Sequence, residues 1–262
     1  LQDYAYQYGR TESRFEEAKI KGPKKDIGSN VLLYTDRCIM CTRCVRFTRE
    51  VTGTGELMVD GRGAREQIDV FPGMPLDNKM SGNVVDICPV GALLDKDFLF
   101  KERVWFLDKT PSIDGYTASG DNITVEHSDG KVQRIKPRYN EQINKSWISD
   151  EIRYSWKPVH DETRLRMPII KHKDDFEIDR VEEAWQEAYK RINEGLEKAS
   201  GIFCLLSPMI SCEDAYWIIE ALKSKNKKTV WGLGPVPFEG ENESFPGGYS
   251  ICSEKAPNAR GV

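Results

Sequence analysis

This 262-residue sequence has no long hydrophobic run, no secretory signal and no large excess of one charge. Its longest apolar stretches, such as GIFCLL, are far too short to span a bilayer. Its N-terminus is polar and lacks a basic flank followed by an apolar core. The formal net charge is −4, from 38 basic and 42 acidic residues, which gives no electrostatic reason to expect nucleic acid or anionic lipid as the main partner. We therefore expect no direct membrane insertion and no nucleic-acid partner.

Motifs of nucleophilic and nucleotide-dependent catalysis are also missing. The histidines His127, His160 and His172 have no cysteine or carboxylate at ligand spacing, and no Ser/His/Asp or Cys/His set is recognisable. The glycine-containing stretches at 52–55 and 232–240 complete neither phosphate-binding motif, so we interpret them as turns. No catalytic residue is predicted.

The seven cysteines fall into two groups. The N-terminal third holds Cys38, Cys41, Cys44 and Cys88. The other three share no spacing; Cys204 lies in an apolar strand pattern and Cys212 just inside a predicted helix, and we interpret both as structural. The odd total argues against a disulfide framework and, with no signal peptide, indicates a reducing compartment.

Composition divides the chain into three expected domains of an α/β protein. Residues 1–110 hold the first four cysteines among short helices and irregular segments, which predicts an α+β domain. Residues 111–165 contain NITVEHSDGKVQRIKP, two β-type runs around an Asp-Gly turn, which predicts a hairpin in a small β-rich module. Residues 166–262 alternate helix and strand patterns, as at the beginning of a parallel α/β domain.

Within the last domain the pattern predicts two helices and two strands. Asp179 is expected to cap a helix whose apolar face comprises Val181, Ala184, Trp185, Ala188, Ile192 and Leu196. GIFCLL then follows as an expected buried strand, Ser211 and Asp214 open a second helix, and KTVWGL forms a second strand. This order predicts a βαβ unit of a parallel sheet.

The run Cys38-x2-Cys41-x2-Cys44 points to a metal centre. A tightly curled backbone can aim three thiolates at one small object and leave the intervening amides free to donate hydrogen bonds to sulfur. Three ligands leave one iron of a 4Fe-4S cluster without a thiolate. Cys88 is the only other cysteine nearby, and the Cys88-Pro89 pair resembles the closing ligand of the bacterial ferredoxin run. Zinc is the rival metal, but its sites typically use two separated pairs, and no second pair or nearby histidine is present.

Four arginines, Arg37, Arg43, Arg46 and Arg49, surround the cysteine run. Beside a cluster made negative by four thiolates, their charge should favour the reduced state and raise the reduction potential. The alternative is that they neutralise the thiolates or pair with acidic neighbours in the sequence.

These residues carry a resemblance to a known family. RCIMCTRCVRFTREVTGTGEL, then SGNVVDICPVGALLDKDF, resembles the second cluster-binding segment of the G subunit of bacterial respiratory NADH:quinone oxidoreductase, the largest iron-sulfur subunit of mitochondrial complex I. The family motif, C-x2-C-x2-C followed at long range by C-P-V-G-A-L, falls on Cys38, Cys41, Cys44 and Cys88. Residues 112–156 resemble the small β module of molybdopterin oxidoreductases, without the cluster cysteines that catalytic members usually carry there.

The resemblance implies an electron-relay subunit with one 4Fe-4S cluster in this chain and no molybdopterin. By the same resemblance, the residues expected to surround the cluster ligands are Arg37, Arg43, Arg46 and Pro89. Because the chain lacks an initiator methionine and opens on LQDYAYQYG, we expect it to be part of a longer polypeptide with further 2Fe-2S and 4Fe-4S clusters before residue 1. The implied partners are the flavin- and NADH-binding subunit and the next iron-sulfur subunit, in a peripheral arm on the cytoplasmic side of the inner membrane.

Three other interpretations stay open at this point. They are the iron-sulfur part of a formate dehydrogenase, the diaphorase part of an NAD-linked hydrogenase, and a zinc-stabilised interaction module. We also expect the glycine- and proline-rich excursion at 71–83 to cover the cluster or meet a partner subunit.

Overall fold

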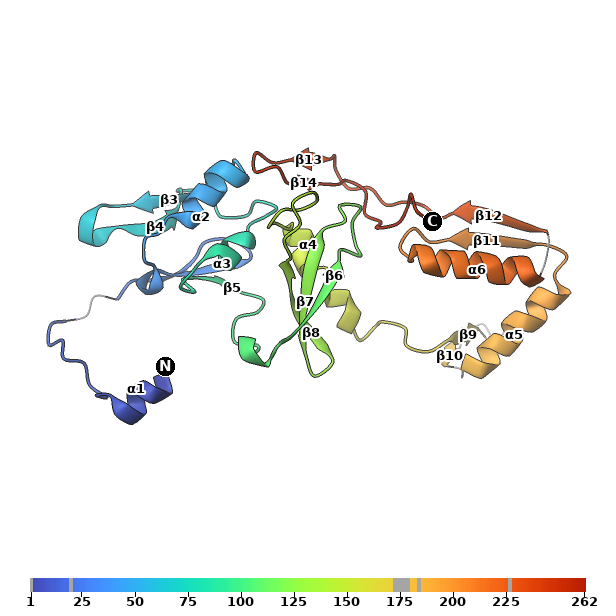
Figure 1. Ribbon diagram of the computed structural model, residues 1–262, viewed down its shortest axis with the longest axis horizontal. Coiled ribbons are helices and arrows are strands. Elements are labelled where there is room, and N and C mark those ends of the chain that lie inside the picture. The colour runs from blue at the N-terminus through green and yellow to red at the C-terminus, as the bar shows by residue number, and fades with distance from the viewer. Residues whose placement is uncertain (1, 19–20, 172–179, 183–184, 226–227) are drawn as a thin grey trace.

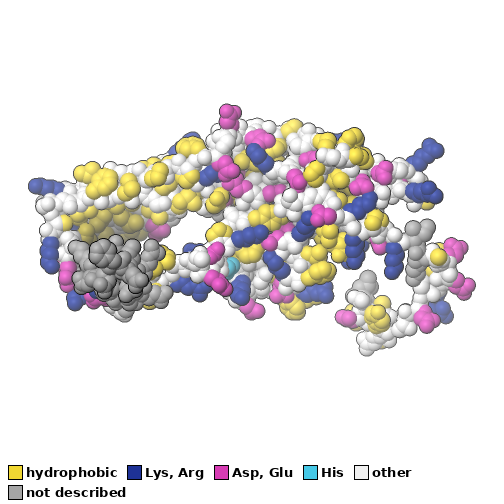
Figure 2. All heavy atoms as spheres, turned by 180° about the vertical axis from the view of Figure 1, so that it is seen from behind, with side chains coloured by type: hydrophobic (Ala, Val, Ile, Leu, Met, Phe, Trp, Pro, Cys, Tyr) yellow, Lys and Arg dark blue, Asp and Glu magenta, His cyan; other side chains and the backbone are white. Residues whose placement is uncertain are grey.

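The computed structural model describes residues 2–18, 21–171, 180–182, 185–225 and 228–262. Figure 1 shows the chain as a succession of small units: the N-terminal part, a central three-stranded sheet, and an α/β part from which the chain returns towards the first two. On the face drawn in Figure 2, basic and acidic side chains are interspersed among hydrophobic ones. Among the described residues, no helix is long and apolar enough to cross a membrane.

The N-terminal part consists of two small sheets with short helices between them. One antiparallel sheet has the order β1-β2-β5 and the other is the hairpin β3-β4. The strands are β1 (Lys24–Asp26), β2 (Val31–Tyr34), β3 (Leu57–Asp60), β4 (Gln67–Val70) and β5 (Leu93–Asp95). The helices are α1 (Gln2–Tyr8), α2 (Arg43–Arg46), α3 (Asn83–Ile87), the π-helical η2 (Phe47–Val51) and the 3-10 turns η1 (Thr35–Arg37), η3 (Gly63–Arg65) and η4 (Val104–Phe106). The expected mixture of short helices and irregular segments is therefore present.

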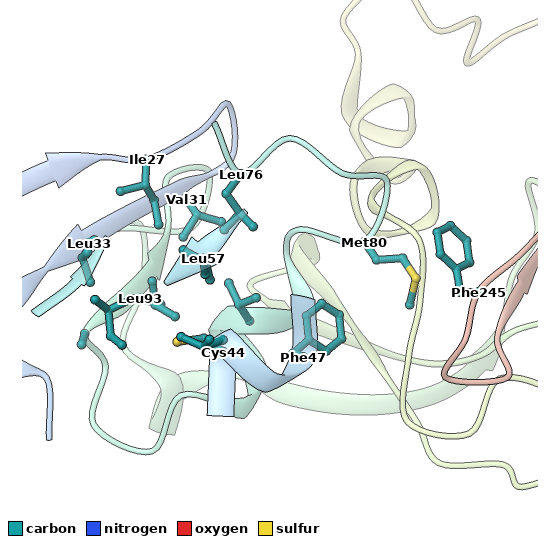
Figure 3. Close-up of a cluster of buried hydrophobic side chains, with 14 of the residues drawn as sticks. Ile27, Val31, Leu33, Cys44, Phe47, Leu57, Leu76, Met80, Leu93 and Phe245 are labelled. Atoms are coloured by element: carbon teal, nitrogen blue, oxygen red, sulfur yellow. The ribbon is translucent and has the colours of Figure 1, made fainter. Parts of the chain in front are cut away.

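One hydrophobic core joins these short elements. Alternate residues of β2 point into it, and Val31 and Leu33 are almost completely buried. Figure 3 shows these side chains around Leu57, with Cys44 and Phe47 approaching from α2 and η2. Because each element is too short to be stable alone, the shared core fixes their relative positions.

The central module is a three-stranded antiparallel sheet in the order β6-β7-β8. It comprises β6 (Asp108–Ile113), β7 (Asn122–Ser128) and β8 (Lys131–Pro137), followed by α4 (Asp150–Tyr154) and the 3-10 turn η5 (Lys157–His160). The predicted hairpin is confirmed, because β7 pairs with β8 across a turn in which Asp129 and Gly130 both have positive φ. Helix α4 begins as capping rules require, since the Ser149 hydroxyl accepts a hydrogen bond from the Ile152 N–H.

The α/β part confirms the predicted unit and corrects two of its details. It contains β9 (Ile169–Lys171), β10 (Arg180–Glu182), α5 (Trp185–Lys198), β11 (Ile202–Leu206), α6 (Cys212–Lys225) and β12 (Thr229–Leu233). Strands β11 and β12 are parallel and flank α6, as predicted, and the Ser211 hydroxyl accepts from the Asp214 N–H at the beginning of that helix. The predicted cap Asp179 lies outside the described residues.

The first correction concerns the beginning of α5. Residues 180–182 form strand β10, paired with β9, so Val181 lies in a strand and the described helix begins at Trp185. The second concerns β11, which is not buried: Phe203 is 68% exposed and Leu205 is 58% exposed. In the described part of the chain this sheet has two strands, so one face of β11 lacks the second layer that buries a parallel strand.

After β12 the chain returns to the first two parts. The returning segment contains the hairpin of β13 (Glu243–Ser244) and β14 (Ser250–Ile251). Phe245 and Ile251 belong to the N-terminal core, and Figure 3 shows Phe245 beside Met80. The Gly247 N–H donates to the Val51 carbonyl at 3.0 Å, which ties the hairpin to the end of η2.

Tyr249 connects this returning hairpin to the central module. Tyr249 is 1% exposed, and its hydroxyl donates a hydrogen bond to Asp121 Oδ2 at 2.5 Å. The hydroxyl oxygen of Tyr249 also accepts a hydrogen bond from the Ser149 N–H at 2.9 Å. Burial raises the pKa of Asp121 to about 7, the bond from Tyr249 acts in the opposite direction, and nearby Asp114 adds to the rise. One buried hydroxyl therefore satisfies polar groups from two other segments.

Replacing Tyr249 by phenylalanine should lower the free energy of unfolding by about 1–3 kcal/mol, because two buried polar groups lose their partner. Urea unfolding monitored by circular dichroism measures the change. Tyr216→Phe is the matched control, since Tyr216 is 57% exposed. Equal effects of the two substitutions would contradict the role given to Tyr249.

The Asp121 carboxyl should also make stability depend on pH. Its folded pKa of about 7 lies above the ordinary value of 3.8, so its contribution is complete below about pH 4 and is lost as pH rises towards 7. Asp121→Asn should remove this part of the pH dependence, measured as the difference between variant and wild-type unfolding free energies across pH 4–8. A difference that does not change with pH would contradict the assignment.

Candidate iron-sulfur site

The loop that carries the first three cysteines is curled by two unusual backbone conformations. Met40 and Thr42 have φ of 54° and 59°, in the left-handed region that residues with a side chain rarely adopt. Between η1 and α2 the loop turns so tightly that the Met40 N–H donates to Cys38 Sγ at 3.4 Å. Such strain is characteristic of binding sites, where the surrounding structure holds it in place.

Each of the three cysteines has a different environment. Cys38 is half-buried and follows η1, Cys41 is exposed in the loop, and Cys44 is buried in α2 against the core. Figure 3 shows Cys44 between the core residues Leu33, Leu93 and Phe47.

The fourth cysteine reaches the same place from a distant segment. Cys88 is half-buried and directly follows α3, where the backbone becomes extended. Pro89 comes next, and Gly91 has a φ of 64°, so the chain turns sharply before it enters β5. Cys88 lines the same cavity as the first three cysteines, and its role as the fourth ligand stays a prediction.

All four cysteines line one cavity. The rest of its lining is mainly apolar: Leu33, Ile39, Ile68, Pro89, Val90, Ala92 and Leu93. Among the residues that the structure describes, no three His, Cys, Asp or Glu side chains are grouped as around a single metal ion.

The thiols also influence one another electrostatically. Burial raises the pKa of Cys44 to about 11; a hydrogen bond from the Val45 N–H acts against this, and the neighbouring Cys38, Cys41 and Cys88 add to the rise. Four thiolates are therefore unfavourable here on their own. A positively charged group in the cavity would reverse this balance, so the donor set fits an iron-sulfur cluster.

The predicted arginines occupy different positions. Arg43 lines both the cysteine cavity and an adjoining hollow of about 810 Å³, which Arg46 also lines together with Cys88 and Pro89. Arg37 lies over the Tyr34 ring at 4.6 Å from its centroid. Arg37 also donates to the Gly91 carbonyl at 3.4 Å. Arg49 is exposed and lines neither cavity.

The alternative explanation for the arginines receives no support from the ion pairs. Within the described part of the chain, no salt bridge joins any of the four arginines to Asp36 or Glu50. Arg43 and Arg46 therefore line the cavities without an ion pair to either of these carboxylates.

Other predicted features lie away from the site. No residue of the excursion at 71–83 lines the cysteine cavity; its Leu76 and Met80 are instead buried in the core. Cys204 is half-buried in β11, and Cys212 is exposed at the first turn of α6, with its thiol 3.8 Å from Asn258 Oδ1. The stretch at 52–55 contains a bend, with Gly53 and Gly55 at positive φ, whereas Gly232 and Leu233 of the other predicted turn lie in strand β12.

Two of the three histidines have defined partners. His127 contacts the Thr110 hydroxyl at 3.0 Å, and His160 Nε2 accepts from the Val132 N–H at 2.9 Å. His172 lies outside the described residues. Sequence reasoning missed the apolar lining from Leu33 and Ile68, because nothing in their own segments marks proximity to the cysteines.

Comparisons with known proteins agree with the chemistry of the cavity. Residues 28–94 match the model of the NADH-quinone oxidoreductase subunit 3 ferredoxin-like domain. Residues 107–157 match the model described as NADH-ubiquinone oxidoreductase NDSU1/NuoG-like, 4Fe-4S domain. Both models describe iron-sulfur domains of NADH-quinone oxidoreductase subunits, so the chain is similar to iron-sulfur proteins.

Curated relatives narrow this class. The chain is 37% identical over 227 residues to the G subunit of the NADH-quinone oxidoreductase of Rickettsia felis, covering 86% of this chain and 33% of the relative. It is 35% identical over 238 residues to the NADH-ubiquinone oxidoreductase 75 kDa subunit of Reclinomonas americana, covering 91% and 34%. It is 43% identical over 174 residues to the mitochondrial NADH dehydrogenase [ubiquinone] iron-sulfur protein 1 of Solanum tuberosum, covering 66% and 23%. The chain belongs to the family of these iron-sulfur subunits of NADH:quinone oxidoreductase, and spans about a third or less of their length.

One matched segment differs from its description. The model that covers residues 107–157 is named for a 4Fe-4S domain, yet this chain has no cysteine between Cys88 and Cys204. The central module therefore offers no thiolate for a cluster of its own.

The burial of Cys44 leads to a testable difference in reactivity. In cluster-free protein at pH 8, iodoacetamide should label Cys41 much faster than Cys44, since a pKa of about 11 reduces the thiolate fraction about a hundredfold relative to an ordinary thiol. Mass spectrometry of peptides measures both rates, and Cys212, exposed and outside the cavity, is the control. Equal labelling of Cys41 and Cys44 would contradict the described burial.

Proposed function

We propose that Cys38, Cys41, Cys44 and Cys88 ligate one 4Fe-4S cluster. We further propose that the chain relays single electrons from the NADH and flavin side of an NADH:quinone oxidoreductase towards quinone. The observation that carries the proposal is the convergence of the four thiols, from two distant segments, on one apolar cavity. The family membership supports the same chemistry.

When bound, such a cluster supplies a reversible one-electron change. The chain's own residues provide its environment. The four thiolates bind, the Met40 amide donates a hydrogen bond to Cys38 Sγ, and apolar side chains such as Leu33 and Ile68 keep water from the inner side. Arg43, on the cavity wall, adds positive charge that favours the reduced state and raises the reduction potential.

The proposal includes the setting of the chain. The relatives are named as subunits of one oxidoreductase, which supports other subunits of that complex as partners. The finer assignment, to a flavin- and NADH-binding subunit on one side and the next iron-sulfur subunit on the other, follows from the resemblance. So do the cytoplasmic side of the inner membrane, the clusters expected before residue 1, and the expectation of no molybdopterin.

Anaerobic reconstitution of the chain tests the ligands. Wild-type protein should bind about four iron and four sulfide and give an electron paramagnetic resonance signal after reduction. Cys88→Ser should weaken or abolish that signal, because the fourth iron loses its thiolate.

Cys252→Ser is the matched control. Cys252 is also half-buried, but it lies beside β14 and does not line the cavity. Its replacement should leave iron content and signal unchanged. Zinc in place of iron, or an unaltered signal in Cys88→Ser, would refute the proposal.

A further inference from the structure

Helix α3 leads directly to Cys88 in the cavity, but the helix is too short to be stable without contacts to other elements. It spans only Asn83–Ile87, far below the roughly 12–15 residues at which an isolated helix becomes even marginally stable. Cys88 is the first residue beyond it. The placement of this thiol therefore depends on what holds α3.

A single buried guanidinium holds two side chains of α3. Arg153, from α4 in the central module, is 4% exposed. Its Nη2 donates to Asp86 Oδ2 at 2.8 Å and to Asn83 Oδ1 at 3.2 Å. These two residues lie three apart, on one side of the helix, so the contact fixes both its rotation and its distance from α4.

Neighbours of Arg153 hold the beginning of the same helix. Asp150 accepts from the Gly82 N–H at 2.8 Å and from the Ser81 hydroxyl at 2.5 Å. The Asn83 amide donates to the Ile148 carbonyl at 2.7 Å, and Asn83 Oδ1 accepts from the Ile148 N–H at 3.2 Å. All of these partners of α3 belong to the segment without cysteines.

The backbone is shaped to admit the guanidinium. A Cβ atom added to Gly82 would lie 2.5 Å from Arg153 Nε and 2.6 Å from Arg153 Cδ, closer than real contacts allow. Gly82 has an ordinary helical φ of −63°, so its conformation does not require glycine. The missing side chain leaves the space through which Arg153 reaches α3.

We propose that Arg153 is a positioning residue for Cys88. By clamping Asp86 and Asn83, it makes the cysteine-free central module the support of the fourth ligand of a cluster held in the neighbouring domain. The inference rests on the proposed function, because it presupposes that Cys88 is a ligand. Arginine suits the task, since its Nη2 atom carries two N–H donors for the two acceptors and the guanidinium keeps its charge when buried.

The test compares Arg153→Met with Arg134→Met in the full 262-residue chain. Arg134 is a matched control: it belongs to the same module and is half-buried against its ion-pair partner Glu126, and neither side chain is hydrogen-bonded to α3. Arg153→Met should lower the affinity for one of the four irons by about 10- to 100-fold, the usual effect of removing a partner that orients a ligand. Chelator competition measures iron retention, and electron paramagnetic resonance of the oxidised sample detects the three-iron product.

Two further variants keep the test decisive if Arg153→Met folds poorly. Arg153→Lys retains the charge, but its ammonium is more strongly hydrated and therefore more costly to bury, so its iron retention should lie between wild type and Arg153→Met. Gly82→Ala keeps a backbone conformation that alanine can adopt, but its Cβ should displace Arg153 and release the same iron.

The outcomes distinguish failure of the positioning role of Arg153 from failure of the proposed cluster ligation. Wild-type protein that binds no 4Fe-4S cluster would overturn both. A wild-type cluster that depends on Cys88 but is retained equally in Arg153→Met and Arg134→Met, or lost equally in both, would overturn the positioning role alone. Selective loss of one iron in Arg153→Met and Gly82→Ala supports it.

Discussion

The structure depends on one constraint: four sulfur atoms from two separate segments must meet in an apolar cavity where they repel one another as thiolates. Burial raises the pKa of the Cys44 thiol to about 11, and its three neighbours add to the rise. A strained loop with Met40 and Thr42 at positive φ holds the first three sulfur atoms in place, and the anchored short helix α3 holds the fourth. A core built from short strands closes the cavity from within. The repulsion that opposes four thiolates in this cavity is also the reason why a cationic cluster would bind there favourably.

The central module and the returning hairpin both contribute contacts that hold the cysteine cavity in place. The central module has no cysteine of its own, yet its polar side chains fix α3, and the returning hairpin contributes Phe245 and Tyr249 to the core that surrounds Cys44. Tyr249 at the same time satisfies Asp121 and Ser149 of the central module. Domain boundaries drawn from composition describe where the sequence changes character. They do not describe which residues share a folding unit, because buried polar networks cross them.

The sequence predicted what is locally encoded. The two-residue spacing grouped Cys38, Cys41 and Cys44, the Asp-Gly pair marked the β7-β8 hairpin, and Ser211 and Asp214 marked the beginning of α6 between two apolar strand patterns. The proline after Cys88 distinguished it from the other cysteines, and Cys88 lines the same cavity as the triple. What could not be predicted comes from long-range contacts: the exposure of β11, the strand at 180–182, and the return of 243–251 to the N-terminal core. None of these has a local signature, because each depends on whether a distant segment supplies a covering layer.

The course of the chain around the α/β part has a consequence for tolerance to change. Everything between η5 and β13 leaves the first two parts and comes back to them, so for the site it acts as one long closed loop (Figure 1). The entropy of closing a loop grows only with the logarithm of its length, by about 0.6 kcal/mol for each doubling. The α/β part can therefore gain, lose or exchange material with little effect on the cysteine cavity, provided that the hairpin still docks. The chain separates a segment free to diverge from a site that must stay fixed, while both remain on one polypeptide.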